Sequence, residues 1–263
     1  SFVYADREIR LTNLSLILQT EFVGWTMRDI PPLLRKTHSK YAIFRDPDIF
    51  NKHMFEYIYS FYCMNYHLSI LHGDLHLNNL TMNQWVSRTS FQDLETYIIY
   101  HIGDKYYAFQ HSETFSTIID FSRAIIADRA KIENEFGERF AAIFFTEQEI
   151  RLIQIVYKYF PRLVEKYPTL RSRVKTHFDV MFKILTAIDT YVTMTNMLVL
   201  FDIEDFGHPI PKECKDLCTK VSKAAFTLIN KYLVMLATGS LSTLDFEFPN
   251  LQILQQMFAA YVI

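Results

Sequence analysis

A group of polar residues between two apolar segments is the first candidate for chemistry in this sequence. The residues His-Gly-Asp-Leu-His-Leu-Asn-Asn run from His72 to Asn79 and lie where a long predicted helix ends and a strand begins. Polar groups at such a junction need partners, which can be one another, water or a ligand. One interpretation is a polar turn whose His and Asn side chains satisfy the last carbonyls of the helix.

A second interpretation combines this segment with an acidic residue further along the chain. Asp74 lies in the loop, Asn79 lies just before a strand, and Asp120 ends a short predicted strand. Two adjacent strand ends would bring Asn79 and Asp120 together as oxygen ligands suited to Mg2+. Asp74 on the same rim would orient and deprotonate a hydroxyl that attacks a phosphoryl group.

The elements that must position these residues can be predicted from local signals. Asp46-Pro47 predicts the start of a long helix, whose apolar face carries Phe50, Met54, Ile58, Phe61 and Leu68. Gly103-Asp104 predicts a hairpin between TYIIYH and KYYAFQ, and short strands are expected at Leu80 to Met82 and at STIID.

Helices are expected to dominate the remainder of the chain. The pattern predicts capping boxes at Thr26 to Asp29 and at Thr146 to Glu149, each of which opens a helix. A long buried helix is expected over residues 178–201, another from Pro211 to Leu236, and a terminal one capped by Asn250. Strands followed by helices indicate an α+β fold with a dominant helical part.

Composition narrows the possible classes of function. The 263 residues have a formal net charge of -2, so a non-specific nucleic-acid role has no support. Three cysteines are too few for a disulfide framework and favour a reducing, cytoplasmic compartment. The most apolar window, residues 178–203, contains Asp179, Lys183 and Asp189, which favours a core helix over a membrane span. Because the sequence begins with Ser1, we expect that residues upstream are missing.

Four motifs in order resemble the protein-kinase-like superfamily. HGDLHLNN resembles its catalytic loop, and the form HGDLH is similar to that of aminoglycoside and choline phosphotransferases. IIDFSRA resembles the metal-binding Asp-Phe-Gly segment, with Ser122 in the Gly position. LILQTEFVGWTMRDI resembles the strand and hinge that hold adenine. Asp189 resembles the buried Asp of the central helix that anchors the catalytic loop.

The resemblance implies a role for each matching residue. Asp74 would be the catalytic base, and His76 would stand where protein kinases have a Lys directed at the transferred phosphate. Asn79 and Asp120 would bind Mg2+, while His72 and Asp189 would support the loop. The backbone of the hinge would bind the adenine of ATP; its residues are Glu21, Phe22, Val23 and Gly24.

The implied organisation is a remnant strand and hinge over residues 1–25, followed by a helical lobe over residues 26–263. Within that lobe the catalytic loop would cover 72–79, an inserted hairpin 84–118 and the metal-binding segment 120–122. The Gly-rich loop and Lys-bearing strand of the family cannot be placed upstream of the hinge. We therefore expect an upstream lobe or a partner to complete the ATP site.

Three hypotheses for function remain open at this point. The first is a divergent serine/threonine protein kinase that acts on a protein substrate and resembles kinases of large DNA viruses. The second is a pseudokinase-like scaffold that binds a partner protein, suggested by Ser122 and the missing lobe. The third is a small-molecule kinase, which Gly73 and His76 favour; Gly73 replaces an Arg that in many protein kinases reads a phosphorylated activation loop.

Overall fold

The computed structural model describes residues 2–4, 7–9, 25–30, 42–84, 97–112, 114–241 and 246–263. Its order of elements is α+β and mostly helical, as predicted. The strands are short and fall in the first half of the chain: β1 (Phe2–Tyr4), β2 (Arg7–Ile9), β3 (Trp25–Thr26), β4 (Ile70–Leu71), β5 (Leu80–Gln84), β6 (Tyr97–Ile102), β7 (Lys105–Gln110), β8 (Thr114–Ile118) and β9 (Ile125–Ile126).

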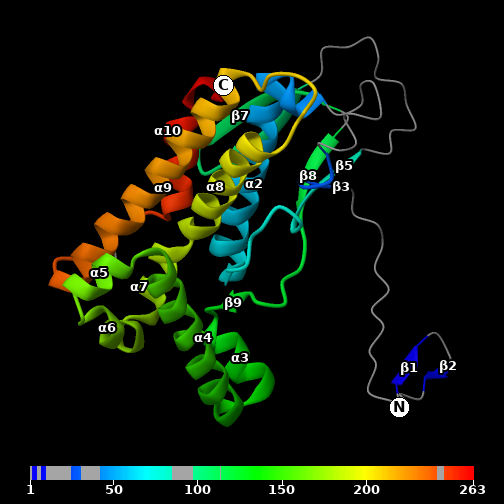
Figure 1. The fold of residues 1–263 in the computed structure, drawn as a ribbon. Coiled ribbons are helices and arrows are strands. Elements are labelled where there is room, and N and C mark those ends of the chain that lie inside the picture. Colours follow the sequence, from blue (N-terminus) through cyan, green and yellow to red (C-terminus); the bar gives the residue numbers. More distant parts are fainter. Residues whose placement is uncertain are drawn as a thin grey trace.

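The helices account for most of the described chain and lie mainly in its second half. They are α2 (Pro47–Leu68), α3 (Arg129–Phe136), α4 (Glu138–Tyr159), α5 (Pro161–Lys166), α6 (Leu170–Thr176), α7 (Phe178–Leu185), α8 (Ala187–Ile203), α9 (Lys212–Thr238) and α10 (Pro249–Met257), with short 3-10 helices η1 (Ala42–Phe44) and η2 (Ala259–Tyr261). In Figure 1, α2, α8 and α9 lie side by side, and β5 and β8 lie on one side of α2.

All strand pairs in the described residues are antiparallel. β5 lies between β3 and β8, and Leu80 pairs with Ile118, so the start of β5 lies beside the end of β8. β6 and β7 form the expected hairpin, in which Ile102 pairs with Lys105 across a two-residue turn. β4 pairs with β9, and β1 pairs with β2. The predicted hairpin at Gly103-Asp104 is therefore confirmed.

Helix α2 forms the centre of the core. Asp46 caps its start by accepting the N–H groups of Asp48 and Ile49, as the Asp-Pro signal predicts. Phe50, Met54 and the other predicted face residues are fully buried, except Leu68, which is 56% exposed at the last turn. A long amphipathic helix thus packs its apolar face against α8, α9 and the strands.

An aromatic cluster joins α2 to the β6–β7 hairpin and to the C-terminal residues. The Phe55 ring on α2 lies 4.6 Å from Phe109 and 5.1 Å from Tyr100, measured between centroids. Tyr261 stacks on Phe109 at 4.3 Å, and Phe258 meets Phe55 edge-on. The hairpin is therefore held to the helical layer mainly by aromatic packing.

Three predictions of helix boundaries need correction. Thr146 does not cap a helix but lies inside α4, where its hydroxyl donates to the carbonyl of Ala142 at 2.9 Å. Asn250 is not a cap either: it lies in the first turn of α10 and its buried side chain bonds Asn65, Thr186 and Thr190. Instead of one helix over residues 178–201 there are two, α7 and α8, separated by Thr186 alone.

Residues 178–203 form the described segment that is long and apolar enough to cross a membrane, and 67% of its most apolar window is buried inside the protein. Such burial is typical of a core helix, which agrees with the interpretation from the sequence. One half of the predicted capping box at Thr26 is present, since its hydroxyl oxygen accepts the N–H of Asp29 at 3.3 Å; the same hydroxyl donates to the Asp29 carboxylate at 2.6 Å. The helix expected after it lies outside the described residues, as does the strand expected before Trp25.

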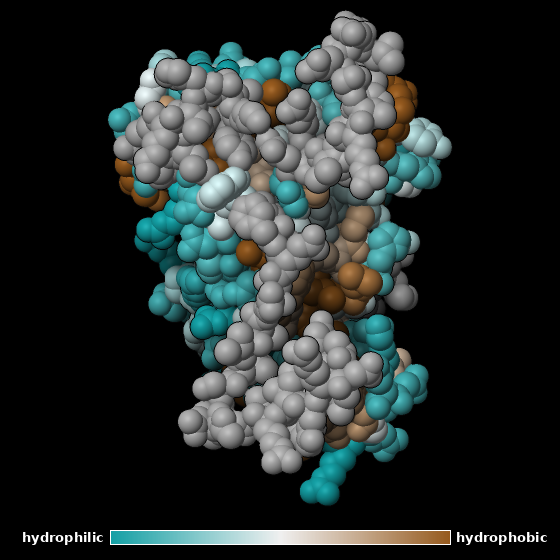
Figure 2. Space-filling model, turned by 90° about the vertical axis from the view of Figure 1, so that its right-hand side faces the viewer, coloured by the Kyte–Doolittle hydropathy of each residue, from teal (hydrophilic) through white to brown (hydrophobic). Residues whose placement is uncertain are grey.

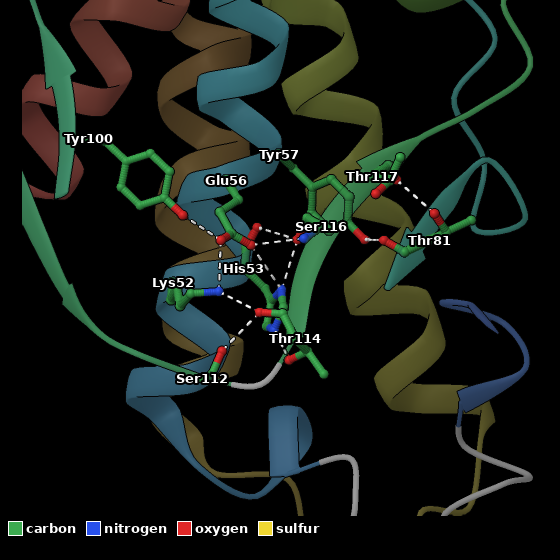
Figure 3. A network of polar contacts seen from close by, with 10 residues as sticks. All are labelled: Lys52, His53, Glu56, Tyr57, Thr81, Tyr100, Ser112, Thr114, Ser116 and Thr117. Carbon is green, nitrogen blue, oxygen red and sulfur yellow. Dashed lines mark hydrogen bonds and ion pairs between the residues drawn. The ribbon is translucent and has the colours of Figure 1, made fainter. Parts of the chain in front are cut away.

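A buried polar network fastens β8 to α2 (Figure 3). The Lys52 ammonium lies 2.7 Å from the Glu56 carboxylate and donates to the Thr114 carbonyl at 2.7 Å. Glu56 also accepts the backbone N–H of Ser116 and the hydroxyl of Tyr100. Because the carboxylate has partners on α2, β6 and β8, its burial is compensated by charge and hydrogen bonds.

His53 completes the network on the same helix. Its ring nitrogens lie 2.8 Å from the Ser116 hydroxyl and 2.9 Å from that of Thr114, and the side chain is fully buried. Burial lowers the pKa of His53. Burial alone would raise the pKa of Glu56, but the hydrogen bonds and charges of His53 and Lys52 outweigh it and lower that pKa to about 2.

We predict that Glu56→Gln destabilises the fold by about 3–5 kcal/mol, because it leaves the buried Lys52 ammonium without its counter-ion. Urea unfolding at pH 7 measures this change. Glu133→Gln is the matched control, since its pair with Arg129 is half exposed at 3.6 Å and should contribute less than about 1 kcal/mol. Equal losses for the two variants would contradict the role of the network.

The network also predicts sensitivity to acid. Folded His53 has a pKa below its ordinary 6.5, so the unfolded chain binds more protons and stability falls as the pH drops below about 6.5. The contribution of Glu56 is present above its ordinary 4.5 and is lost as the pH falls towards about 2. Urea unfolding between pH 7 and 3 should show both losses, and Glu56→Gln should flatten the lower one.

Candidate functional site

The loop His72–Asn79 follows α2 through a tight reversal. Ser69 ends the helix in the left-handed conformation, with φ of 53°, and its carbonyl accepts the N–H of Ala127 at 2.8 Å. The β4–β9 pair then sets the next two residues beside the segment that follows Asp120. The predicted loop and the predicted metal-binding segment are therefore neighbours in space.

A buried carboxylate on α8 holds the start of the loop. Asp189 accepts the N–H of His72 at 2.8 Å through Oδ2 and the N–H of Gly73 at 3.0 Å through Oδ1. Its side chain is 1% exposed. Burial raises the pKa of Asp189, and the hydrogen bonds from the backbone N–H groups of His72 and Gly73 oppose this rise.

His72 connects the loop to the end of β8. Its Nε2 lies 2.9 Å from the carbonyl of Ile119, while its Nδ1 accepts the N–H of Asp74 at 3.4 Å. A carbonyl only accepts, so Nε2 carries the proton and Nδ1 has the lone pair, as in a neutral imidazole. The ring also packs 5.0 Å from Phe121. This arrangement is that of a supporting residue.

Asn79 and Asp120 lie at adjacent strand ends, as predicted. The N–H of Ile119 donates to the carbonyl of Asn79 at 3.0 Å, which places Asp120 one residue beyond that contact. The Asn79 amide donates through Nδ2 to the carbonyl of Asp74 at 3.0 Å, which leaves the amide oxygen Oδ1 as its acceptor.

The Asp120 carboxylate is exposed and its backbone is unusual. Asp120 has a φ of 61°, and Oδ1 accepts the N–H of Ser122 at 3.3 Å. Hydrogen bonds from Ser122 lower the pKa of Asp120. The side-chain oxygen atoms of Asn79 and Asp120 are of the donor type that Mg2+ prefers. Across the described residues, no group of three or more His, Cys, Asp or Glu side chains could hold a metal.

Asp74 and His76 line two different cavities. The Asp74 side chain is one-third exposed, and its Oδ2 lies 3.5 Å from Nε of Arg123. His76 is exposed and lines a cavity of about 350 Å3 together with Arg28 and residues of α8. Figure 2 shows the face that lies on the right in Figure 1, where a hollow with hydrophobic walls opens partway down the surface.

Some predicted site residues lie outside the described residues, and the sequence did not predict one residue that lines the site. Glu21, Phe22, Val23 and Gly24, the predicted adenine-binding hinge, lie outside the described residues. Arg123 was not singled out by the sequence, although it follows the metal-binding segment directly. Its contact with Asp74 joins residues about fifty positions apart, which the residue types alone do not signal.

Comparisons with known proteins leave the function open. No protein-family model matches the chain, and no solved structure matches it. It is similar to the uncharacterized protein C717R of African swine fever virus, with 27% identity over 268 residues for isolate Pig/Kenya/KEN-50/1950 and 26% over 266 residues for isolate Tick/Malawi/Lil 20-1/1983. Each match covers 90% of this chain, which spans 37% of the length of those relatives. The expected similarity to viral proteins is thereby supported.

We predict that Asp189→Asn loosens the loop. The Asn amide has one oxygen and one NH2 group, whereas the two backbone N–H donors require two acceptors. One donor therefore loses its partner, which should lower the free energy of unfolding by about 1–3 kcal/mol. Hydrogen exchange should accelerate at the amides of His72 and Gly73. Asp202→Asn, at an exposed position paired with Lys215, is the control and should change stability by less than about 0.5 kcal/mol. Unchanged exchange in Asp189→Asn would contradict the anchoring role.

Proposed function

We propose that this chain is the catalytic lobe of an ATP- and Mg2+-dependent phosphotransferase whose acceptor is a serine or threonine hydroxyl of a protein. The observation that carries the proposal is a loop that contains Asp74 and Asn79, is anchored by the buried Asp189, and contacts at Asn79 the strand end that carries Asp120. Asp120 and Asp189 are far from this loop in the sequence, and the residues follow the order of the kinase-like motifs.

In the proposed reaction each residue has a distinct task. The acceptor hydroxyl oxygen forms a bond to the γ-phosphorus of ATP as the bond from that phosphorus to the β–γ bridging oxygen breaks, and ADP leaves. Asp74 accepts the hydroxyl proton, for which its partly exposed carboxylate is suited. Bound Mg2+ would neutralise charge on the phosphates, and Asn79 and Asp120 would hold it. His76, near Asp120, would face the transferred group.

A second candidate function is a scaffold without transfer activity. The ion pair between Arg123 and Asp74 favours it, because a cation at 3.5 Å occupies the carboxylate that would have to accept a proton. The Arg123 side chain is 74% exposed, however, so its displacement by an acceptor would cost little. A thermal shift with ATP and Mg2+ distinguishes the two, since a ligand that binds the native state raises its stability.

We predict that Asp74→Asn in the full-length protein lowers phosphate transfer by about 10²–10⁴-fold, the usual contribution of a general base. Transfer of labelled phosphate to a generic protein substrate measures the rate, and a thermal melt should show an intact fold. Asp216→Asn on the exposed side of α9 is the matched control and should retain full activity. Undiminished transfer by Asp74→Asn would rule out this residue as the base.

A further inference from the structure

A basic pocket lies beside Asp74, on the side that faces α4. It encloses about 330 Å3 between the catalytic loop, the segment Arg123–Ile125 and one face of α4. The lining combines three cationic side chains, one carboxylate and a few neutral groups: Gly73, Asp74, Arg123, Ile125, Arg151, Gln154, Ile155, Lys158 and Tyr159. None of the motifs that carry the kinase resemblance includes α4, so this pocket adds to the site.

The cations of this pocket come from two elements that are fastened together. Gln148 of α4 accepts the N–H of Ile126 through its side-chain oxygen at 3.4 Å, and Arg151 donates to the carbonyl of Ala124 at 3.4 Å. The Arg151 contact uses one of five guanidinium N–H donors, so the others remain for a ligand. Lys158 is exposed and lies over the ring of Tyr159 at 4.8 Å.

Gly73 lines the pocket between the loop and α4. A Cβ at this position would lie 3.6 Å from the Arg123 carbonyl and 3.8 Å from Cδ1 of Ile155. Any longer side chain at Gly73 would therefore extend into the space between the loop and α4. The φ of 74° also favours glycine here. The space beside Asp74 is thus left for a ligand.

We propose that this pocket binds an anionic group of the acceptor, so that the substrate is a serine or threonine peptide with a phosphorylated or acidic residue close to the hydroxyl. The inference rests on the proposed function. Three cations against one carboxylate favour an anion, and guanidinium groups match the geometry of phosphate and carboxylate oxygens. The same charges disfavour cationic alcohols such as amino sugars and choline, the acceptors that the form of the loop suggests.

The test measures peptide binding and phosphate transfer separately. Fluorescence anisotropy with the full-length protein, without nucleotide, compares serine peptides that differ at one neighbouring residue: phosphoserine, Glu or Gln. We expect the phosphoserine and Glu peptides to bind at least tenfold more tightly than the Gln peptide. Tighter binding of the phosphoserine peptide than of the Glu peptide would show that the pocket prefers phosphate. Equal affinities of these two peptides would show that it accepts either phosphate or carboxylate.

Variants connect the preference to the pocket. Arg151→Gln and Lys158→Gln should each lower the affinity for the phosphoserine and Glu peptides by about tenfold. The affinity for the Gln peptide should not change. Lys166→Gln, at the last residue of α5 and with its cation over the Tyr167 ring, is the matched control and should change no peptide affinity. Circular dichroism and thermal melts establish that each variant is folded.

The possible failures can be told apart. Equal binding of the three peptides, or anionic binding that neither variant weakens, would overturn the inference even if phosphate transfer is observed. Displacement of the peptide by ATP with Mg2+, together with equal weakening of ATP binding by Arg151→Gln, would assign the pocket to the nucleotide and also overturn it. Anionic binding that depends on Arg151, without transfer to any peptide, would support the pocket and contradict only the proposed phosphotransferase.

Discussion

The geometry of the site depends on one buried carboxylate. Asp189 is placed by α8 at the centre of the core, and its two oxygens accept consecutive N–H groups of the loop. Two consecutive backbone donors that share one carboxylate fix the direction of the chain at His72 and Gly73. The neighbouring residues take their positions from this direction: Asp74 follows directly, and Asn79 closes the loop with a hydrogen bond to the Asp74 carbonyl.

The second constraint is the position of β8 relative to α2. The Lys52–His53–Glu56 network connects the beginning and middle of β8 to the helix that precedes the loop. The end of β8 carries Asp120, and the end of α2 leads to His72. A single set of buried charges therefore sets the relative position of the two segments that approach each other at His72 and Ile119. Packing and chemistry depend on the same helix.

The sequence was informative where a structure is determined by adjacent residues. The cap at Asp46, the hairpin turn at Gly103-Asp104 and the burial of Asp189 were predicted, because the signals are local or belong to a recognisable motif. Thr146 was misassigned because a Thr three residues before a Glu satisfies the capping pattern, yet the helix had already begun at Glu138. Asn250 was misassigned because its side chain bonds residues of α2 and α8 that are distant in the sequence.

The partners of Lys52, His53 and Glu56 could not be inferred, since the network needs β8 groups some sixty residues away. The basic pocket was also missed, because its cations are spread over Arg123, Arg151 and Lys158 and meet only when α4 packs beside the loop. An apolar helix pattern predicts which face is buried, but it does not show which polar residues that face also buries. Polar contacts between residues distant in the sequence could therefore be identified only from the structure.

The left-handed backbone at Asp120 affects how mutations would accumulate in related chains. Asp, Asn and Gly tolerate a φ of 61°, whereas β-branched residues are penalised by about 1–2 kcal/mol. Position 120 would thus keep a short polar residue or glycine whether or not the chain transfers phosphate. Asp74 lacks this backbone restriction, since it is not among the described residues with positive φ. Retention of Asp at position 74 across relatives would therefore be the clearer sign of selection for catalysis.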